Sequence, residues 1–95
     1  MKLLINYDIK ETDSDEDIIE YIKSQTDWVH LQLSSWIVET SLNKTTMYEK
    51  ILSLLGKETK SKVAVFDITK QAVSANLYTG EKKNENSKRL FTESV

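Results

Sequence analysis

The stretch that decides the fold is Lys2-Leu3-Leu4-Ile5-Asn6-Tyr7-Asp8, near the start of the chain. Successive side chains of a strand point to opposite faces. The two faces here are Leu3, Ile5 and Tyr7 on one side and Leu4, Asn6 and Asp8 on the other. Because both faces are apolar near the start, the stretch predicts a buried central strand. That strand delivers one acidic side chain, Asp8, to its exposed end, and we expect Asp8 to take part in any chemistry.

Composition narrows the classes of protein that the chain can belong to. Its 95 residues suffice for one domain. The absence of cysteine excludes disulfides, thiolate zinc sites and cysteine nucleophiles, and the single histidine, His30, excludes a multi-histidine metal site within one chain. No apolar run reaches the ~20 residues of a membrane helix, and the apolar run at the N-terminus is too short for a signal peptide. We therefore expect a cytoplasmic protein without membrane contact.

The net charge of −2 bears on the choice of partner. Proteins that bind nucleic acid through its phosphates are usually basic, so this chain would need a local basic patch or bridging metal ions. Weak acidity suits a protein-binding module equally well. The most basic segment is the polar tail 79–95, which is interpreted as a solvated tail, a phosphate-contacting arm or a segment docked on a partner subunit. Its candidate phosphate ligands are Lys82, Lys83, Lys88 and Arg89.

Hydrophobic periodicity predicts the elements that follow the first strand. An isoleucine stripe predicts a helix over 15–26, with Ser14 as its N-cap and Asp17 completing a capping box. Residues 28–40 read as a β-hairpin that turns at 33–35. His30 is expected to be half exposed, and Trp36 to lie in the core or an interface rather than to stack on bases.

The second half of the domain repeats the helix–strand pattern. A capping box from Thr46 to Glu49 predicts a helix that begins there and ends at a Gly56 C-cap. An apolar strand over 63–68 follows, and 71–78 is weakly strand-like. We therefore expect one domain over 1–78, with an extra C-terminal strand allowed for.

The order strand, helix, strand, strand, helix, strand predicts the α+β, ferredoxin-like βαββαβ fold. Right-handed crossovers give a four-stranded antiparallel sheet in the order 4-1-3-2, with both helices on one face. The end of the first strand then lies beside the start of the third. This topology predicts that Ser34 and Ser35 lie near Asp8.

The sheet face opposite the helices is expected to be an interface. Leu4 contributes apolar surface to it, and we assign Asn6 and Trp36 to the same interface. A face-to-face homodimer would bury this surface and bring two copies of Asp8 together.

Two motifs resemble a known family. The strand ending Tyr7-Asp8 and the segment His30-Leu31-Gln32-Leu33-Ser34-Ser35-Trp36 are similar to the small CRISPR-associated Cas-two family and its relatives, virulence-associated protein D and the SinR-like proteins. That family often has Arg-x-Gln-x-Ser-x-aromatic at the second and third strands. Gln32, Ser34 and Trp36 match this spacing, whereas His30 stands where arginine is common. The resemblance covers roughly residues 1–78.

The resemblance implies a homodimer with Asp8 and its mate at the subunit interface. Some family members are described as magnesium-dependent nucleases acting on RNA or DNA. On that reading Asp8 would bind Mg²⁺, Ser34 or Ser35 would orient a phosphate or a metal-bound water, and His30 and Gln32 would contact nucleic acid. Other members bind nucleic acid or protein without catalysis. The alternative is therefore a non-catalytic acidic binding protein that docks on a protein or nucleoprotein complex, for example in phage–host conflict.

Overall fold

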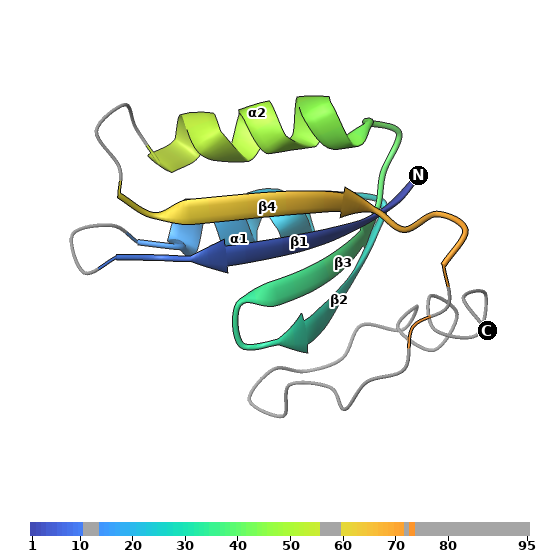
Figure 1. Ribbon diagram of the computed structural model, residues 1–95, viewed down its shortest axis with the longest axis horizontal. Helices are drawn as coiled ribbons and strands as arrows, with labels where there is room; N and C mark the ends of the chain where they lie inside the picture. Colours follow the sequence, from blue (N-terminus) through green and yellow to red (C-terminus); the bar gives the residue numbers. More distant parts are fainter. Residues whose placement is uncertain (11–13, 56–59, 72, 74–95) are drawn as a thin grey trace.

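The structure is a computed structural model that describes residues 1–10, 14–55, 60–71 and 73. The elements in chain order are β1 (Lys2–Asp8), α1 (Glu16–Lys23), β2 (Asp27–Gln32), β3 (Ser35–Glu39), α2 (Lys44–Leu55) and β4 (Lys62–Asp67). The four strands form one antiparallel sheet in the order β2-β3-β1-β4 (Figure 1). This order is the predicted 4-1-3-2 read in reverse, so the predicted α+β topology is confirmed.

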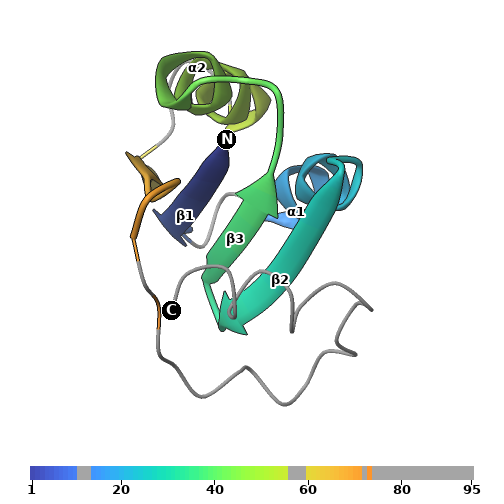
Figure 2. The ribbon, with the colours of Figure 1, turned by 90° about the vertical axis from the view of Figure 1, so that its right-hand side faces the viewer.

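Both helices lie on the same face of the sheet, which is clearest when the sheet is seen end-on (Figure 2). Alternate side chains of β1 and β3 point to this face and pack against the apolar stripes of α1 and α2. The fully or nearly buried residues of this main core are Leu3, Ile5, Tyr7, Ile18, Ile22, Trp36, Val38, Met47, Ile51 and Leu55. The central position predicted for β1 follows from its two partners, β3 and β4.

A smaller apolar cluster lies on the opposite face of the sheet. Val29, Leu31 and Ile37 are buried there, with Leu4 packed against them. The segment after β4 also contributes, because Ile68 and Val73 pack on the same cluster. The predicted apolar character of this face is therefore present, and the chain's own residues cover part of it.

The helix limits differ from the predicted ones: α1 spans Glu16–Lys23 instead of 15–26, and Ser14 is not its N-cap. Helix α1 has Asp15 at its N-cap position, and the Ser14 hydroxyl accepts a hydrogen bond from the Glu16 N–H at 3.2 Å. The predicted Thr46–Glu49 capping box is wrong: α2 begins two residues earlier, and the Asn43 side-chain oxygen accepts from the Thr46 N–H at 2.9 Å. Asparagine is among the strongest N-caps.

The β2–β3 turn falls at 33–34, within the predicted 33–35. The expected C-cap at Gly56, almost all of the weakly strand-like segment 71–78 and the tail 79–95 lie outside the described residues.

A polar cap closes the end of β4. The Thr69 hydroxyl and backbone N–H both donate to one oxygen of Asp67, at 2.6 and 3.0 Å. These two hydrogen bonds, first that of the hydroxyl, lower the pKa of Asp67 below its ordinary value. The Lys2 N–H donates to the same Thr69 hydroxyl at 3.0 Å, which ties the segment after β4 to β1.

Replacing Thr69 with valine tests this cap. The variant keeps the side-chain shape but loses the hydroxyl donor, so the pKa of Asp67 is expected to rise toward its ordinary value. Because a lowered carboxyl pKa stabilises the fold above the unfolded-state pKa, the wild type loses this contribution as the pH falls through the pKa of folded Asp67. The stability of the variant should therefore fall less than that of the wild type over the same range of acidic pH. An NMR titration of the Asp67 carboxyl measures the shift, and an unchanged pKa would contradict the assignment.

Candidate functional site at the end of β1

Strand β1 carries Asp8 to its exposed end, as predicted. The Asp8 side chain is 67% exposed, and its carboxylate forms an ion pair with Lys10, whose Nζ lies 3.0 Å from Oδ2. The register of the sheet places Asp8 opposite Lys62 at the start of β4. The acidic side chain is therefore flanked by two lysines, one directly paired with it.

The β2–β3 turn lies beside the same end of β1. The Tyr7 N–H donates to the Ser34 carbonyl at 3.0 Å, and Asn6 pairs with Ser35 in the ladder. Both serines are half buried. The topology thus places them near Asp8, but in the described part of the chain no hydrogen bond joins either hydroxyl to the Asp8 carboxylate.

A shallow hollow of about 250 Å³ opens next to Asp8. It lies between β1 and β4, and its lining residues are Asn6, Tyr7, Asp8, Lys62, Val63 and Ala64. The small side chain of Ala64 and the short one of Asn6 are cross-strand neighbours, which leaves room above them. The floor of the hollow is mainly apolar, with charge only at its Asp8–Lys62 end.

The donor set at this end of β1 fits a magnesium ion poorly. Magnesium prefers carboxylate and other oxygen ligands, whereas the single carboxylate here is paired with the Lys10 ammonium and faces Lys62 across the ladder. Among the described residues, no group of three or more His, Cys, Asp or Glu side chains could hold a metal ion. The predicted magnesium site therefore stays a prediction.

The predicted nucleic-acid contacts are not gathered at this site. The His30 ring is stacked on Trp36, with centroids 3.8 Å apart, and its Nε2 lies 3.1 Å from the Leu33 carbonyl oxygen. His30 is only 9% exposed, so the expected half-exposed position is wrong. Gln32 is exposed at the end of β2. The basic candidates Lys82, Lys83, Lys88 and Arg89 lie outside the described residues.

Of the three predicted interface residues, two lie on the expected face. Leu4 and Asn6 are half buried on the face opposite the helices. The assignment of Trp36 to the interface is wrong. Trp36 belongs to the helix-side core and is 0% exposed, so it offers no surface to a second subunit. Its position opposite Ile5 in the ladder places both side chains on the helix face.

A chain of buried hydrogen bonds lies behind the site and was not predicted from the sequence. The Trp36 Nε1–H donates to the Tyr7 hydroxyl at 3.1 Å, and the Tyr7 hydroxyl donates to Asp15 Oδ2 at 3.1 Å. This chain fastens the start of α1 to β1 and β3. A tyrosine at a core position of β1 was the available signal, since a buried phenol usually finds a hydrogen-bond partner.

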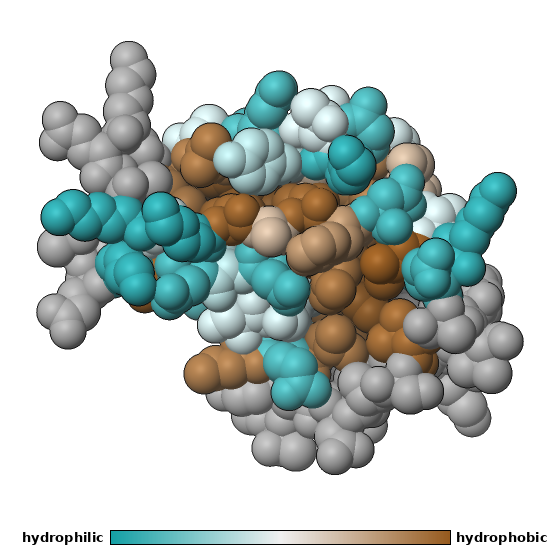
Figure 3. All heavy atoms as spheres, viewed as in Figure 1, coloured by the Kyte–Doolittle hydropathy of each residue, from teal (hydrophilic) through white to brown (hydrophobic). Residues whose placement is uncertain are grey.

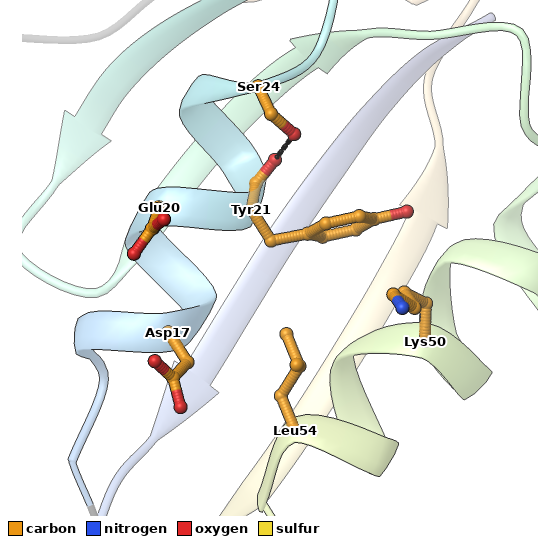
Figure 4. A pocket seen from close by; sticks show the side chains of 6 residues that line it. All are labelled: Asp17, Glu20, Tyr21, Ser24, Lys50 and Leu54. Carbon is orange, nitrogen blue, oxygen red and sulfur yellow. Dashed lines mark hydrogen bonds between the residues drawn. The ribbon is translucent and has the colours of Figure 1, made fainter.

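A second hollow, of about 310 Å³, lies between the two helices (Figure 4). Asp17 and Glu20 of α1 lie on one side of it and Lys50 of α2 on the other, with Tyr21 and Leu54 between them. The Lys50 ammonium lies 5.6 Å from the centre of the Tyr21 ring. Asp17 also stands in the first turn of α1, where the helix dipole favours a carboxylate.

Comparison with known proteins adds no relative: no family model, no curated protein and no solved structure matches the chain. The resemblance to the Cas-two family therefore depends on the quoted motifs alone and stays a prediction. None of the helices in the described part of the chain is long and apolar enough to cross a membrane.

Proposed function

We propose that this chain is a non-catalytic binding protein that docks on a protein or nucleoprotein complex in the cytoplasm. The observation that carries the proposal is the ion pair between Asp8 and Lys10, with 3.0 Å between Nζ and Oδ2. A nuclease of the Cas-two type would need the Asp8 carboxylate as a metal ligand. Here the Lys10 ammonium group is paired with one oxygen of that carboxylate.

The charges around Asp8 support the same conclusion. A divalent cation placed at Asp8 would be repelled by Lys10, and Lys62 faces the same residue across the ladder. A second copy of Asp8 would add one carboxylate to the site, but it would carry its own paired lysine with it. Asp8 thus balances local positive charge at the end of the sheet.

A magnesium-dependent nuclease remains the second candidate, because the topology does place Ser34 and Ser35 beside the strand that ends at Asp8. Those hydroxyls could orient a phosphate only if Asp8 released Lys10 and bound a metal ion. The nuclease therefore requires the Asp8 carboxylate as a metal ligand, whereas the binding protein does not.

The Asp8→Asn variant separates them. Asparagine keeps the size of the side chain and removes only an exposed ion pair, which is worth ~0–1 kcal/mol, so the variant should fold with nearly unchanged stability. We expect wild type and variant to show the same magnesium-dependent cleavage of RNA, single-stranded DNA and duplex DNA, at the background level of a mock preparation. Gel assays with fluorescent substrates measure the cleavage, and circular dichroism checks the fold.

Lys10→Gln is the matched control, because it breaks the same ion pair and leaves the carboxylate in place. Binding of a co-purified partner complex should survive both substitutions, since neither charge is assigned to the docking. Cleavage that both the wild type and Lys10→Gln perform, and that folded Asp8→Asn has lost, would overturn the proposal in favour of the nuclease.

A further inference from the structure

Strand β4 is the least protected strand of the sheet. It lies at one end of the strand order and pairs with β1 alone among the described residues. None of its residues is buried, although four in a row, Val63, Ala64, Val65 and Phe66, are apolar. The strand at the opposite end, β2, is largely buried. An apolar edge strand of this kind is a template for pairing with another strand.

The backbone of β4 offers hydrogen-bonding groups on its outer edge. Ile68 donates to the Lys2 carbonyl at 2.9 Å, which fixes the alternation of the β1–β4 ladder. Residues at even positions therefore direct their backbone groups toward β1. Val63 and Val65 direct theirs outward, where no strand of the described chain accepts them.

Common protections against edge pairing are missing from β4. Natural edges are often blunted by proline, by a bulge or by charges in the middle of the strand. The chain contains no proline, the β1–β4 register is continuous, and the charged residues of β4, Lys62 and Asp67, stand only at its two ends. Among the described residues, no strand pairs with the outer edge of the middle of β4.

Exposed apolar side chains of α2 lie along the same edge of the sheet. Tyr48 and Leu52 are 39% and 36% exposed, and Phe66 of β4 is 49% exposed. At about 100° per residue, Tyr48 and Leu52 lie on the side of α2 away from Lys50 and Leu54, which face α1. Three of the five large hydrophobic residues exposed in the described chain therefore lie along the β4 edge of the sheet, Tyr48 and Leu52 on the helix face and Phe66 on the opposite face. Figure 3 looks onto this side and shows hydrophobic side chains gathered along β4.

We propose that the outer edge of β4 pairs with β4 of a second copy of this chain, antiparallel and about a two-fold axis at Val65. The sheets of the two copies then form one continuous eight-stranded sheet, and the α2 helices meet on the same face. This inference goes beyond the proposed function, which does not depend on how copies associate.

Charge and shape select a second copy as the occupant. In the antiparallel self-pairing centred on Val65, Lys62 lies opposite Ile68 and Asp67 opposite Val63 of the other strand, so like charges do not meet. A parallel pairing in register would instead place lysine beside lysine and aspartate beside aspartate. Centring on Val65 sets Ala64 opposite the Phe66 of the partner strand, on the face opposite the helices. The 250 Å³ hollow beside Ala64 is then filled by that phenyl ring.

The edge is also a better interface than the sheet face. Ile68 and Val73 already pack on the apolar cluster of that face, so a face-to-face dimer would have to displace them or pack over them. Pairing along β4 leaves this segment in place. The predicted homodimer is thereby assigned a different surface from the one that the sequence suggested.

Light scattering and a pair of lysine variants test the surface. The wild type is expected to show twice the chain mass at high micromolar concentration. Phe66→Lys places a charge in the interface and should weaken dimerisation at least tenfold, while the exposed control Leu33→Lys, in the β2–β3 turn, should dimerise like the wild type. A monomeric wild type over this range, or a Phe66→Lys variant that dimerises normally, would overturn the proposal.

A cysteine substitution tests the register independently. Directly paired antiparallel residues have Cα atoms ~5.5 Å apart, within the ~4.4–6.8 Å that a disulfide spans. The chain has no native cysteine, so Val65→Cys introduces a unique thiol at the two-fold axis. Mild oxidation should link this variant into covalent dimers and leave Leu33→Cys mostly unlinked. Equal linkage of both variants, or none at position 65, contradicts the pairing.

Discussion

Replacing Trp36 with alanine is expected to lower the free energy of unfolding by ~3–5 kcal/mol, the usual range for truncating a buried aromatic residue. Trp36 is the largest of the fully buried side chains. The His30 ring stacks on it with centroids 3.8 Å apart, and the Trp28 ring packs at 5.7 Å. Truncation would leave a cavity lined by these rings and would remove the donor to the Tyr7 hydroxyl.

Urea denaturation followed by circular dichroism measures this loss. Leu33→Ala is the matched control, since Leu33 lies in the same hairpin but is 67% exposed and should change stability by no more than ~0.5 kcal/mol. If the two variants lost equal stability, the assignment of Trp36 to the main core would be wrong.

The face of Trp36 shows what the sequence could and could not predict. The hydrophobic pattern identified the hairpin, but no glycine marks its turn. Shifting a turn by one residue moves every side chain of the following strand to the other face. The sequence therefore left Trp36 between core and interface, whereas the observed turn at 33–34 places it opposite Ile5 on the helix face.

The environment of His30 was unpredictable for a related reason. Strand alternation places His30 on the face opposite its buried neighbours Val29 and Leu31, which suggests an exposed ring. Both faces of β2 are covered, however, and the ladder shifts register between His30 and Gln32. Burial of this ring depends on the tertiary contact with Trp36, which a single sequence does not reveal.

The positions of the candidate site residues were predicted from the sequence, whereas the ion pair of Asp8 was not. Strand order alone placed Ser34 and Ser35 beside the end of β1, because topology fixes which strand ends are neighbours. The partner of Asp8 was overlooked, although Lys10 stands two residues further along the chain. Alternation places residues two apart on the same face, so the possibility of this ion pair was readable from the sequence.

Replacing Tyr7 with phenylalanine is expected to destabilise the fold by ~1–3 kcal/mol, although only one oxygen atom is removed. The Tyr7 side chain lies in the main core, and its hydroxyl accepts from Trp36 Nε1–H while donating to Asp15 Oδ2, both at 3.1 Å. Phenylalanine would fill the same space but leave the buried indole N–H without this acceptor. It would also remove the hydrogen bond that joins β1 to Asp15 at the start of α1.

A double-mutant cycle with Trp36→Phe isolates the hydrogen bond from the packing. Phenylalanine at position 36 has no N–H, so adding Tyr7→Phe to that variant leaves no buried donor unpaired. We expect the second substitution to cost at least ~0.5 kcal/mol less in this background than in the wild type, a coupling typical of side chains in direct contact. Tyr48→Phe is the control, because Tyr48 is 39% exposed and should tolerate loss of its hydroxyl. Strictly additive effects of the two core substitutions would show that the Tyr7 hydroxyl stabilises the fold through Asp15 rather than through Trp36.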